Sequence, residues 1–152
     1  MGKYYEEFEV GEVYTTPSRT IGEYDVMAFA GLSGDYNPIH TDHEFAVITQ
    51  FGQRIAHGAL GLSVATGLIA RTGLFDGTAV AFLGIDNWRF SQPIFLGDTI
   101  HVEFTITAMR ETKNPATGIL TRNVKIVNHR GETVQSGDMT LMVQRRRADI
   151  DN

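Results

Sequence analysis

The stretch from Gly58 to Arg71 constrains the fold of this chain more than any other segment. Apolar side chains lie on every side of this stretch when it is drawn as a helix, and its first charged residue is Arg71. A helix that is apolar all round is normally buried, so we predict a buried helix over 58–71. Gly58, Gly61 and Gly67 each cost up to about 1 kcal/mol relative to alanine in a helix interior. We therefore expect other groups to pack close to the helix backbone at these glycines.

The second half of the chain has the periodicity of β-strands. Residues 79–90 are apolar and aromatic, with a bulge expected at Gly84. Residues 99–109 alternate, and two further strands are predicted over 119–128 and 132–143. One face of the alternating strand consists of Ile100, Val102, Phe104 and Ile106. Helices followed by consecutive strands are typical of the α+β class with an antiparallel sheet.

The first half is predicted to contain a short strand region and two helices. Residues 12–21 have a β-favouring composition that Pro17 interrupts. A helix is expected to begin at Gly22 and to end near Gly34. Thr41 is expected to open a second, short helix that runs through Ile48.

Length and composition exclude several classes of protein. The 152 residues predict one domain over 1–152, with 144–152 as a flexible C-terminal tail. The formal net charge of −5 argues against a nucleic-acid-binding protein, and the absence of cysteine excludes disulfides and thiolate chemistry. Neither a secretion signal nor an apolar run long enough to cross a membrane is found, so we expect a cytoplasmic protein.

The segment from Gly34 to Asp42 concentrates the polar groups that could carry chemistry. Pro38 fixes its own φ and favours an extended conformation at Asn37, which stiffens the chain between Asp35 and His40. A carboxylate and an imidazole that face one small site could activate a water molecule and move a proton, with Asn37 orienting either group. The same residue types are common in turns, so the residues alone leave a purely structural role open.

The pattern Gly34-Asp-x-Asn-Pro-x-His40, followed by Asp42 and Ala46, resembles the signature of the MaoC-like (R)-specific enoyl-CoA hydratases. Ala56-His57-Gly58 and the segment 95–100 are similar to the same family, so the resemblance covers roughly residues 21 to 143. The resemblance implies a hot-dog fold, in which a curved antiparallel sheet wraps a long buried central helix. It also implies a homodimer, or a higher homo-oligomer, that binds acyl-CoA near the subunit interface.

The activity that the resemblance implies is that of a hydro-lyase. Such an enzyme adds water to a trans-2-enoyl-CoA, or to an acyl carrier protein thioester, to give the (R)-3-hydroxyacyl product, or runs the reverse dehydration. The resemblance assigns Asp35 and His40 as the catalytic pair and the amide of Gly58 as the donor to the thioester carbonyl. An amide at a helix N-terminus is unsatisfied within the helix and suits a developing oxyanion. We also expect Asp35 to be partly desolvated, because a fully hydrated aspartate is a weak base.

Neither a cofactor nor a metal is expected. His40, Asp42 and His43 lie close in the sequence, but no second cluster completes a coordination sphere, and hydration of an enoyl thioester needs no metal. His57 is expected to shape the entry to the helix. The hydroxyls of Ser63 and Thr66 are expected to bond helix carbonyls.

Two further sets of residues have weaker predictions. Phe51, Gln53 and Ile55 are predicted to shape an acyl tunnel before the long helix. The cations that could meet CoA phosphates are Arg71, Arg89, Lys113 and Arg122, and the sequence allows all four equally as scattered surface charges.

Two alternative functions remain open from the sequence. A hot-dog thioesterase would also use a carboxylate and a helix-end amide, but it would cleave the thioester. A non-catalytic acyl-CoA-binding module would keep the scaffold without the reaction. His40 within the Asn-Pro-x-His motif favours hydration over hydrolysis. The presence of Asp35, Asn37 and His40 together argues against a binding module.

Overall fold

The fold is described for residues 1–146 of a computed structural model of the chain. A 3₁₀ turn over Tyr5–Glu7 precedes the strands and helices. These elements, in chain order, are β1 (Val13–Thr15), β2 (Arg19–Thr20), α1 (Glu23–Ser33), α2 (Pro38–Thr41), α3 (His43–Val47), α4 (Gly58–Ala70), β3 (Ala79–Phe90), β4 (Thr99–Glu111), β5 (Thr117–Asn128) and β6 (Thr133–Gln144).

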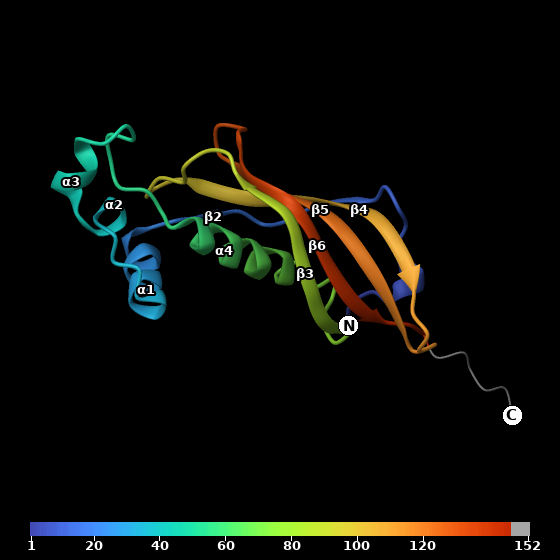
Figure 1. Cartoon of the computed structure of the whole chain (residues 1–152). Coiled ribbons are helices and arrows are strands. Elements are labelled where there is room, and N and C mark those ends of the chain that lie inside the picture. The colour runs from blue at the N-terminus through green and yellow to red at the C-terminus, as the bar shows by residue number, and fades with distance from the viewer. Residues whose placement is uncertain (147–152) are drawn as a thin grey trace, which may run out of the picture.

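Six antiparallel strands form one curved sheet along α4. The strand order is β1-β4-β5-β6-β3, and β2 pairs with the first two residues of β4. Figure 1 shows α4 lying along one face of the sheet, with α1, α2 and α3 gathered beyond one end of α4. The predicted α+β class and the hot-dog arrangement are confirmed.

The core lies between α4 and the sheet. The predicted alternation in β4 is confirmed, because the four apolar residues of its inner face are at most 1% exposed. Leu60, Val64 and Leu68 of α4 are also buried. The bulge predicted at Gly84 is confirmed by a register shift between Phe82 and Gly84 where β3 pairs with β6.

The prediction that α4 is buried all round is wrong for the single chain. The sheet covers one side of the helix, where Leu60, Val64 and Leu68 lie. The opposite side is open, and it carries the exposed residues Ala59, Ser63, Thr66, Gly67 and Ala70. A sheet packs against only one face of a helix, so the apolar composition of the other face needs a separate explanation.

Two of the three glycines in α4 meet the expected close packing. A Cβ on Gly58 would lie 2.7 Å from Cε1 of Phe90, and a Cβ on Gly61 would overlap Nε2 of Gln135 and lie 2.8 Å from Cδ1 of Ile94. The prediction is wrong for Gly67, because beyond the adjoining residues and backbone of α4 itself, no atom of residues 1–146 lies within 4 Å of the Cβ position there.

Gly61→Ala is therefore expected to lower the free energy of unfolding by about 1–3 kcal/mol, because the added methyl group displaces buried Gln135 and Ile94. Gly31→Ala is the control, since Gly31 lies on exposed α1 with only the Tyr36 hydroxyl nearby, at 3.4 Å. It should raise stability by about 0.5–1 kcal/mol through helix propensity. Urea unfolding measures both variants, and equal effects would contradict the packing at Gly61.

The N-terminal half follows the prediction with two differences. Pro17 separates β1 from β2, and α1 ends at Gly34, as the sequence indicates. Gly34 adopts the left-handed conformation, with φ of 78°. The turn-rich stretch after Gly34 contains α2, which was not predicted. Asp42 rather than Thr41 caps α3, because Oδ1 of Asp42 accepts a hydrogen bond of 3.0 Å from the amide of Phe45.

A flexible tail was predicted over 144–152, but the structure places 144–146 against the rest of the protein. Gln144 is the last residue of β6, and Arg145 and Arg146 form ion pairs of 2.8 Å with Glu6 and Glu7. These charge pairs hold 144–146 against the N-terminal turn, so this part of the prediction is wrong. Residues 147–152 of that prediction lie outside the described residues.

Membrane-spanning helices are absent from residues 1–146, in which the longest helix has 13 residues.

Candidate active site

Asp35 lies on the loop that leaves α1 after Gly34. Its Oδ1 accepts a hydrogen bond of 3.1 Å from the amide of Asn37, and its own amide donates to Oγ of Ser33 at 3.1 Å. This is the turn role that the sequence left open. Only one carboxylate oxygen takes part in the turn, so Oδ2 is free to face a substrate.

His40 is held at the end of this turn by the short helix α2. Asn37 has φ of −51° and ψ of 132°, the extended conformation that Pro38 favours, and its Oδ1 caps α2 by accepting from the amide of Ile39 at 3.1 Å. Nδ1 of His40 lies 2.7 Å from the carbonyl oxygen of Ile55. A carbonyl oxygen only accepts, so Nδ1 carries the proton and Nε2 is the nitrogen that faces the site. Asn37 thus positions His40 through the backbone and does not bond to its ring.

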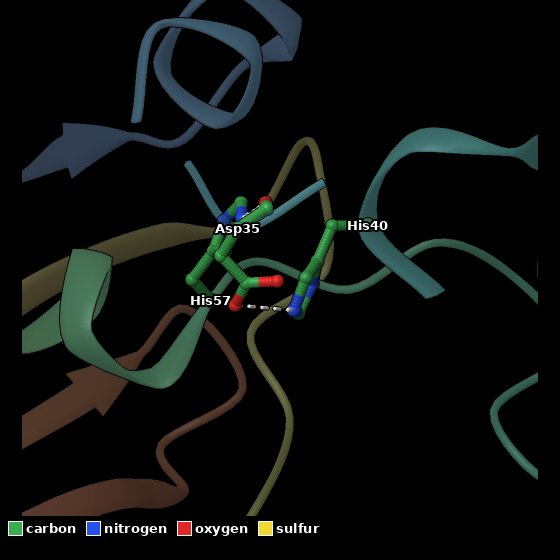
Figure 2. Close-up of side chains that lie close together, drawn as sticks. All are labelled: Asp35, His40 and His57. Carbon is green, nitrogen blue, oxygen red and sulfur yellow. Dashed lines mark hydrogen bonds and ion pairs between the residues drawn. The ribbon is translucent and has the colours of Figure 1, made fainter. Parts of the chain in front are cut away.

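The carboxylate of Asp35 and the imidazole of His40 face each other, as Figure 2 shows, with Oδ2 and Nε2 3.9 Å apart. This distance is too long for a direct hydrogen bond. It allows one water molecule or one substrate atom to contact both groups, which acid–base catalysis requires. The sequence therefore predicted correctly that these two side chains lie together.

The expected desolvation of Asp35 is not found in the single chain. The Asp35 side chain is 52% exposed, whereas that of His40 is 11% exposed. The loop carries Asp35 out from the end of α1, which leaves more than half of its side chain open to water within residues 1–146. Burial on the His40 side alone does not remove water from the aspartate.

His57 connects Asp35 and His40, a role that the sequence did not predict. Its ring is 3% exposed and stacks on that of His40, with ring centroids 3.8 Å apart and an angle of 26° between planes. Nε2 of His57 donates to the carbonyl oxygen of Asp35 at 2.9 Å. His57 precedes the first residue of α4, so the start of that helix fixes the backbone of Asp35 and the ring of His40 together. The sequence signals were its place at the entry to an apolar helix and its part in the match of Ala56-His57-Gly58 to the family.

Within residues 1–146, Asp35, His40 and His57 are also the group that comes nearest to a metal site. One ligand atom from each lies within 4.8 Å of the other two. A metal binds an imidazole nitrogen about 2.0–2.1 Å away and close to the plane of the ring. Two rings stacked 3.8 Å apart place an ion well outside at least one of those planes, so the arrangement does not suit coordination by both histidines.

Gly58 begins α4 next to His57. Within the described part of the chain, its amide has no hydrogen-bond partner, as expected at the first position of a helix. Its carbonyl oxygen accepts from Nε2 of Gln135 at 3.1 Å, and Oε1 of Gln135 accepts from Nε1 of Trp88 at 3.2 Å. The buried amide of Gln135 thereby holds the start of α4 against β6. Sequence reasoning missed Gln135, although it falls on the inward face of its strand with Met139 and Leu141.

A pocket of about 430 Å³ opens beside Gly58. Its walls include Phe51, Ile55, Gly58, Phe90, Ile94 and Gln135. Of the three residues predicted to shape an acyl tunnel, Phe51 and Ile55 line this pocket and Gln53 does not. An apolar pocket next to a free helix-end amide can hold an apolar group attached to a carbonyl.

Arg54 ties α1 to the segment before α4. Its guanidinium donates to both carboxylate oxygens of Glu23, one at 2.9 Å, and to the carbonyl oxygen of His40 at 3.4 Å. The hydrogen bonds from Arg54 lower the pKa of Glu23. Arg54 thus links the start of α1 and the backbone of His40 to the segment that leads into α4.

The remaining predictions concern the two hydroxyls of α4 and the four cations that could meet CoA phosphates. The hydroxyls of Ser63 and Thr66 donate to the carbonyls of Ala59 and Ser63, at 2.8 and 2.7 Å, as predicted. Three of the four candidate cations are exposed: Arg71, Arg89 and Lys113. Arg122 is not a surface charge, because it is only 3% exposed on the inner face of β5.

A family model described as a MaoC like domain matches residues 7–128. The protein MaoC of Klebsiella aerogenes is 41% identical over 103 residues, which make up 68% of this chain and 30% of that protein. The (R)-specific enoyl-CoA hydratase of Aeromonas caviae is 38% identical over 112 residues, or 74% of this chain and 81% of the relative.

A solved structure gives the same result in three dimensions. The unliganded R-hydratase of Pseudomonas aeruginosa superposes with a TM-score of 0.79 at 34% sequence identity, over 94% of this chain and 86% of that one. The matched family model includes the loop of Asp35 and His40 and the start of α4. On these grounds, the chain belongs to the MaoC-like domain family.

Proposed function

We propose that this chain is a hydro-lyase that hydrates a trans-2-enoyl-CoA to the (R)-3-hydroxyacyl-CoA, or catalyses the reverse dehydration. The observation that carries the proposal is the distance of 3.9 Å between Oδ2 of Asp35 and Nε2 of His40. The amide of Gly58, at the start of α4 directly after His57, has no hydrogen-bond partner within the described residues. The names of the relatives support it, since they include (R)-specific enoyl-CoA hydratases and a 3-hydroxybutyryl-CoA dehydratase.

In the hydration direction, Asp35 takes a proton from a water molecule as the water oxygen forms a bond to C3 of the substrate. Negative charge then develops on the thioester carbonyl oxygen, which accepts a hydrogen bond from the amide of Gly58. His40 enters the cycle as the imidazolium, with a proton on each ring nitrogen. Its Nε2 proton goes to C2, which completes the addition of water. The proton held by Asp35 returns to His40 before the next cycle.

His57 and Asn37 act as positioning residues in this mechanism. His57 holds the backbone of Asp35 and stacks on His40, and Asn37 caps the helix that presents His40. Neither residue transfers a proton. The reaction needs no cofactor, because water is the co-substrate and Asp35 and His40 supply the proton transfers.

The working form is proposed to be a homodimer. The open face of α4 is built from small residues, and β3 is one of the two edges of the sheet within residues 1–146. Large apolar residues on β3 are 46–60% exposed: Val80, Phe82, Leu83 and Phe90. An apolar edge strand next to an apolar helix face is typical of a surface that a second copy covers.

Leu83→Arg is expected to shift the protein from dimer to monomer, because the new charge lies on the β3 edge. Leu32→Arg is the matched control, since Leu32 is 85% exposed on α1, away from β3. Sedimentation velocity or light scattering gives the mass of each variant. A dimer that persists in Leu83→Arg, or a monomeric parent protein, contradicts this interface.

The reaction is tested with purified protein and crotonyl-CoA. Loss of the enoyl absorbance without release of free thiol supports hydration. Thiol release indicates a thioesterase instead. If neither signal changes with crotonyl-CoA or with longer enoyl thioesters of CoA and acyl carrier protein, the proposal is overturned and a binding module remains.

A further inference from the structure

Gln135 is a polar side chain in the apolar interior of the protein. It lies on the inner face of β6 with Met139 and Leu141, and it is only 2% exposed. A side-chain amide loses its hydrogen bonds to water when it is buried, which is unfavourable unless protein groups replace them. The groups that Gln135 meets therefore explain why a polar residue is stable at this position.

Both ends of the side-chain amide of Gln135 are paired. Its Oε1 accepts a hydrogen bond from Nε1 of Trp88 at 3.2 Å, and its Nε2 donates to the carbonyl oxygen of Gly58 at 3.1 Å. The two bonds form a chain that runs from β3 through β6 to the first residue of α4. Hydrogen bonds in such a chain polarise one another, so each bond strengthens the other.

Two glycines provide the space for this chain of hydrogen bonds. A Cβ on Gly61 would overlap Nε2 of Gln135 and lie 3.1 Å from its Cδ. A Cβ on Gly137 would lie 2.6 Å from Cε3 of Trp88. A larger residue at either position would displace the side-chain amide or the indole, so both glycines are needed to keep the two bonds.

Gly58 needs support because it is a glycine at the end of a helix. A residue without Cβ has the greatest conformational freedom, and helix ends fray. The peptide group before Gly58 is held through the carbonyl of His57, which accepts from the amides of Leu60 and Gly61 at 3.1 and 3.3 Å. The peptide group after Gly58 is held by Gln135. Together these bonds restrict both backbone angles of Gly58 and fix the direction of its amide.

We propose that Gln135 and Trp88 are positioning residues that hold the amide of Gly58 in the direction in which it binds the thioester carbonyl. This inference rests on the proposed function, in which that amide stabilises the developing negative charge. A hydrogen-bond donor is most effective when it is already aligned with the charge before the reaction begins. Gln135 acts through the carbonyl of Gly58, and Trp88 acts through Gln135.

Gln135→Met is expected to lower kcat for hydration of crotonyl-CoA by about 10–100-fold, since a misplacement of about 1 Å can cost a factor of that order. KM should change less than about threefold, because the interaction is lost mainly in the transition state. Methionine is similar in size to glutamine but cannot donate to Gly58. Parent-like kcat in a folded Gln135→Met protein overturns the proposal.

Trp88→Phe tests the second residue of the chain. The bond from Gln135 to Gly58 remains, but its supporting donor is lost, so kcat should fall by about 2–10-fold, the factor that corresponds to one hydrogen bond. If Gln135→Met does not fold, parent-like kcat in Trp88→Phe overturns the proposal instead.

Ile106→Val is the matched control for a general loss of stability. Ile106 is fully buried in β4, and it is not part of the lining of the pocket beside Gly58. Removing one methylene group from it also destabilises the core. This variant is expected to keep the parent kcat. If it loses as much kcat as Gln135→Met at a similar melting temperature, destabilisation alone explains the effect and the proposal is overturned.

Trp88 gives a direct signal of the pair, because it is the only tryptophan in the sequence. Its fluorescence depends on the surroundings of the indole. Gln135→Met should therefore change the emission spectrum of the folded protein, whereas Ile106→Val should not. An identical spectrum in Gln135→Met contradicts the bond between Trp88 and Gln135 and overturns the proposal.

The carbonyl band of a bound thioester tests the inference without turnover. Crotonyl-CoA with an isotope label at its thioester carbonyl is bound to Asp35→Asn, and its infrared stretching band is compared with that of the free thioester. A hydrogen bond from the amide of Gly58 lowers the stretching frequency, and adding Gln135→Met should reverse most of this shift. No shift, or a shift that does not depend on Gln135, overturns the inference.

This measurement separates failure of the inference from failure of the proposed function. If the parent protein does not hydrate crotonyl-CoA but the shift depends on Gln135, the proposed function fails and the positioning role stands. If the parent protein hydrates crotonyl-CoA and the shift is the same with and without Gln135, the positioning role fails alone.

Discussion

Asp35→Asn is expected to lower kcat for hydration of crotonyl-CoA by about 10²–10⁴-fold, the range typical of the loss of a general base. The substitution keeps an oxygen that can accept from the amide of Asn37 at the Oδ1 position, so the turn is preserved. It removes the negative charge that faces Nε2 of His40. Initial rates of enoyl absorbance loss give kcat and KM, and the effect should fall mainly on kcat.

Asp42→Asn is the matched control for this variant. Asp42 lies in the same segment, and its Oδ1 also accepts from a backbone amide, that of Phe45, but its carboxylate does not pair with His40. Hydration by Asp42→Asn is expected to stay within about threefold of the parent rate, since it keeps the helix cap. Parent-like turnover by Asp35→Asn would remove Asp35 from the mechanism.

His40→Ala is expected to lower the same rate by a comparable factor, about 10²–10⁴-fold, because the imidazole supplies the proton for C2. This variant also loses the bond from Nδ1 to Ile55 and the stacking on His57, so it should be less stable by about 1–3 kcal/mol. His40→Gln keeps a similar volume and an N–H that can reach the carbonyl of Ile55. It should therefore be more stable than the alanine variant and equally slow.

His43→Gln is the control for position 40. His43 is exposed at the start of α3 and lies only three positions along the chain. Thermal unfolding followed by circular dichroism separates the stability effect from the rate effect. If His40→Gln hydrates crotonyl-CoA at the parent rate, the imidazole has no part in proton transfer and the mechanism is wrong.

Local patterns explain why much of the fold could be predicted. Alternation in β4, the bulge at Gly84 and the end of α1 near Gly34 depend on the few residues around each position, and all three predictions were correct. The helix α2 was missed because Pro38 and Asn37 are signals both of a turn and of a helix start. The site prediction was also local, since Asp35 and His40 are joined by a short segment that Pro38 stiffens.

The open face of α4 shows what such local patterns do not predict. An apolar side chain indicates that a position is to be covered, but it does not indicate by which element or which chain. The sheet covers Leu60 and Val64 and leaves Thr66 and Gly67 open. The exposure of Asp35 has the same origin, because whether a carboxylate loses its water depends on what packs over its loop.

The sequence by itself determined most of the helices and strands, the antiparallel sheet around one apolar helix, and the short spacing that brings a carboxylate to an imidazole. The tertiary structure alone decided that His57 stacks on His40, that Gln135 holds the first turn of α4, and that Arg122 is buried with no acidic partner among residues 1–146. These contacts join residues between 17 and 77 positions apart or depend on several strands at once. Hydrophobic periodicity fixes which face of an element points inward, whereas the identity of the group that it meets there is set only when helix and sheet pack together.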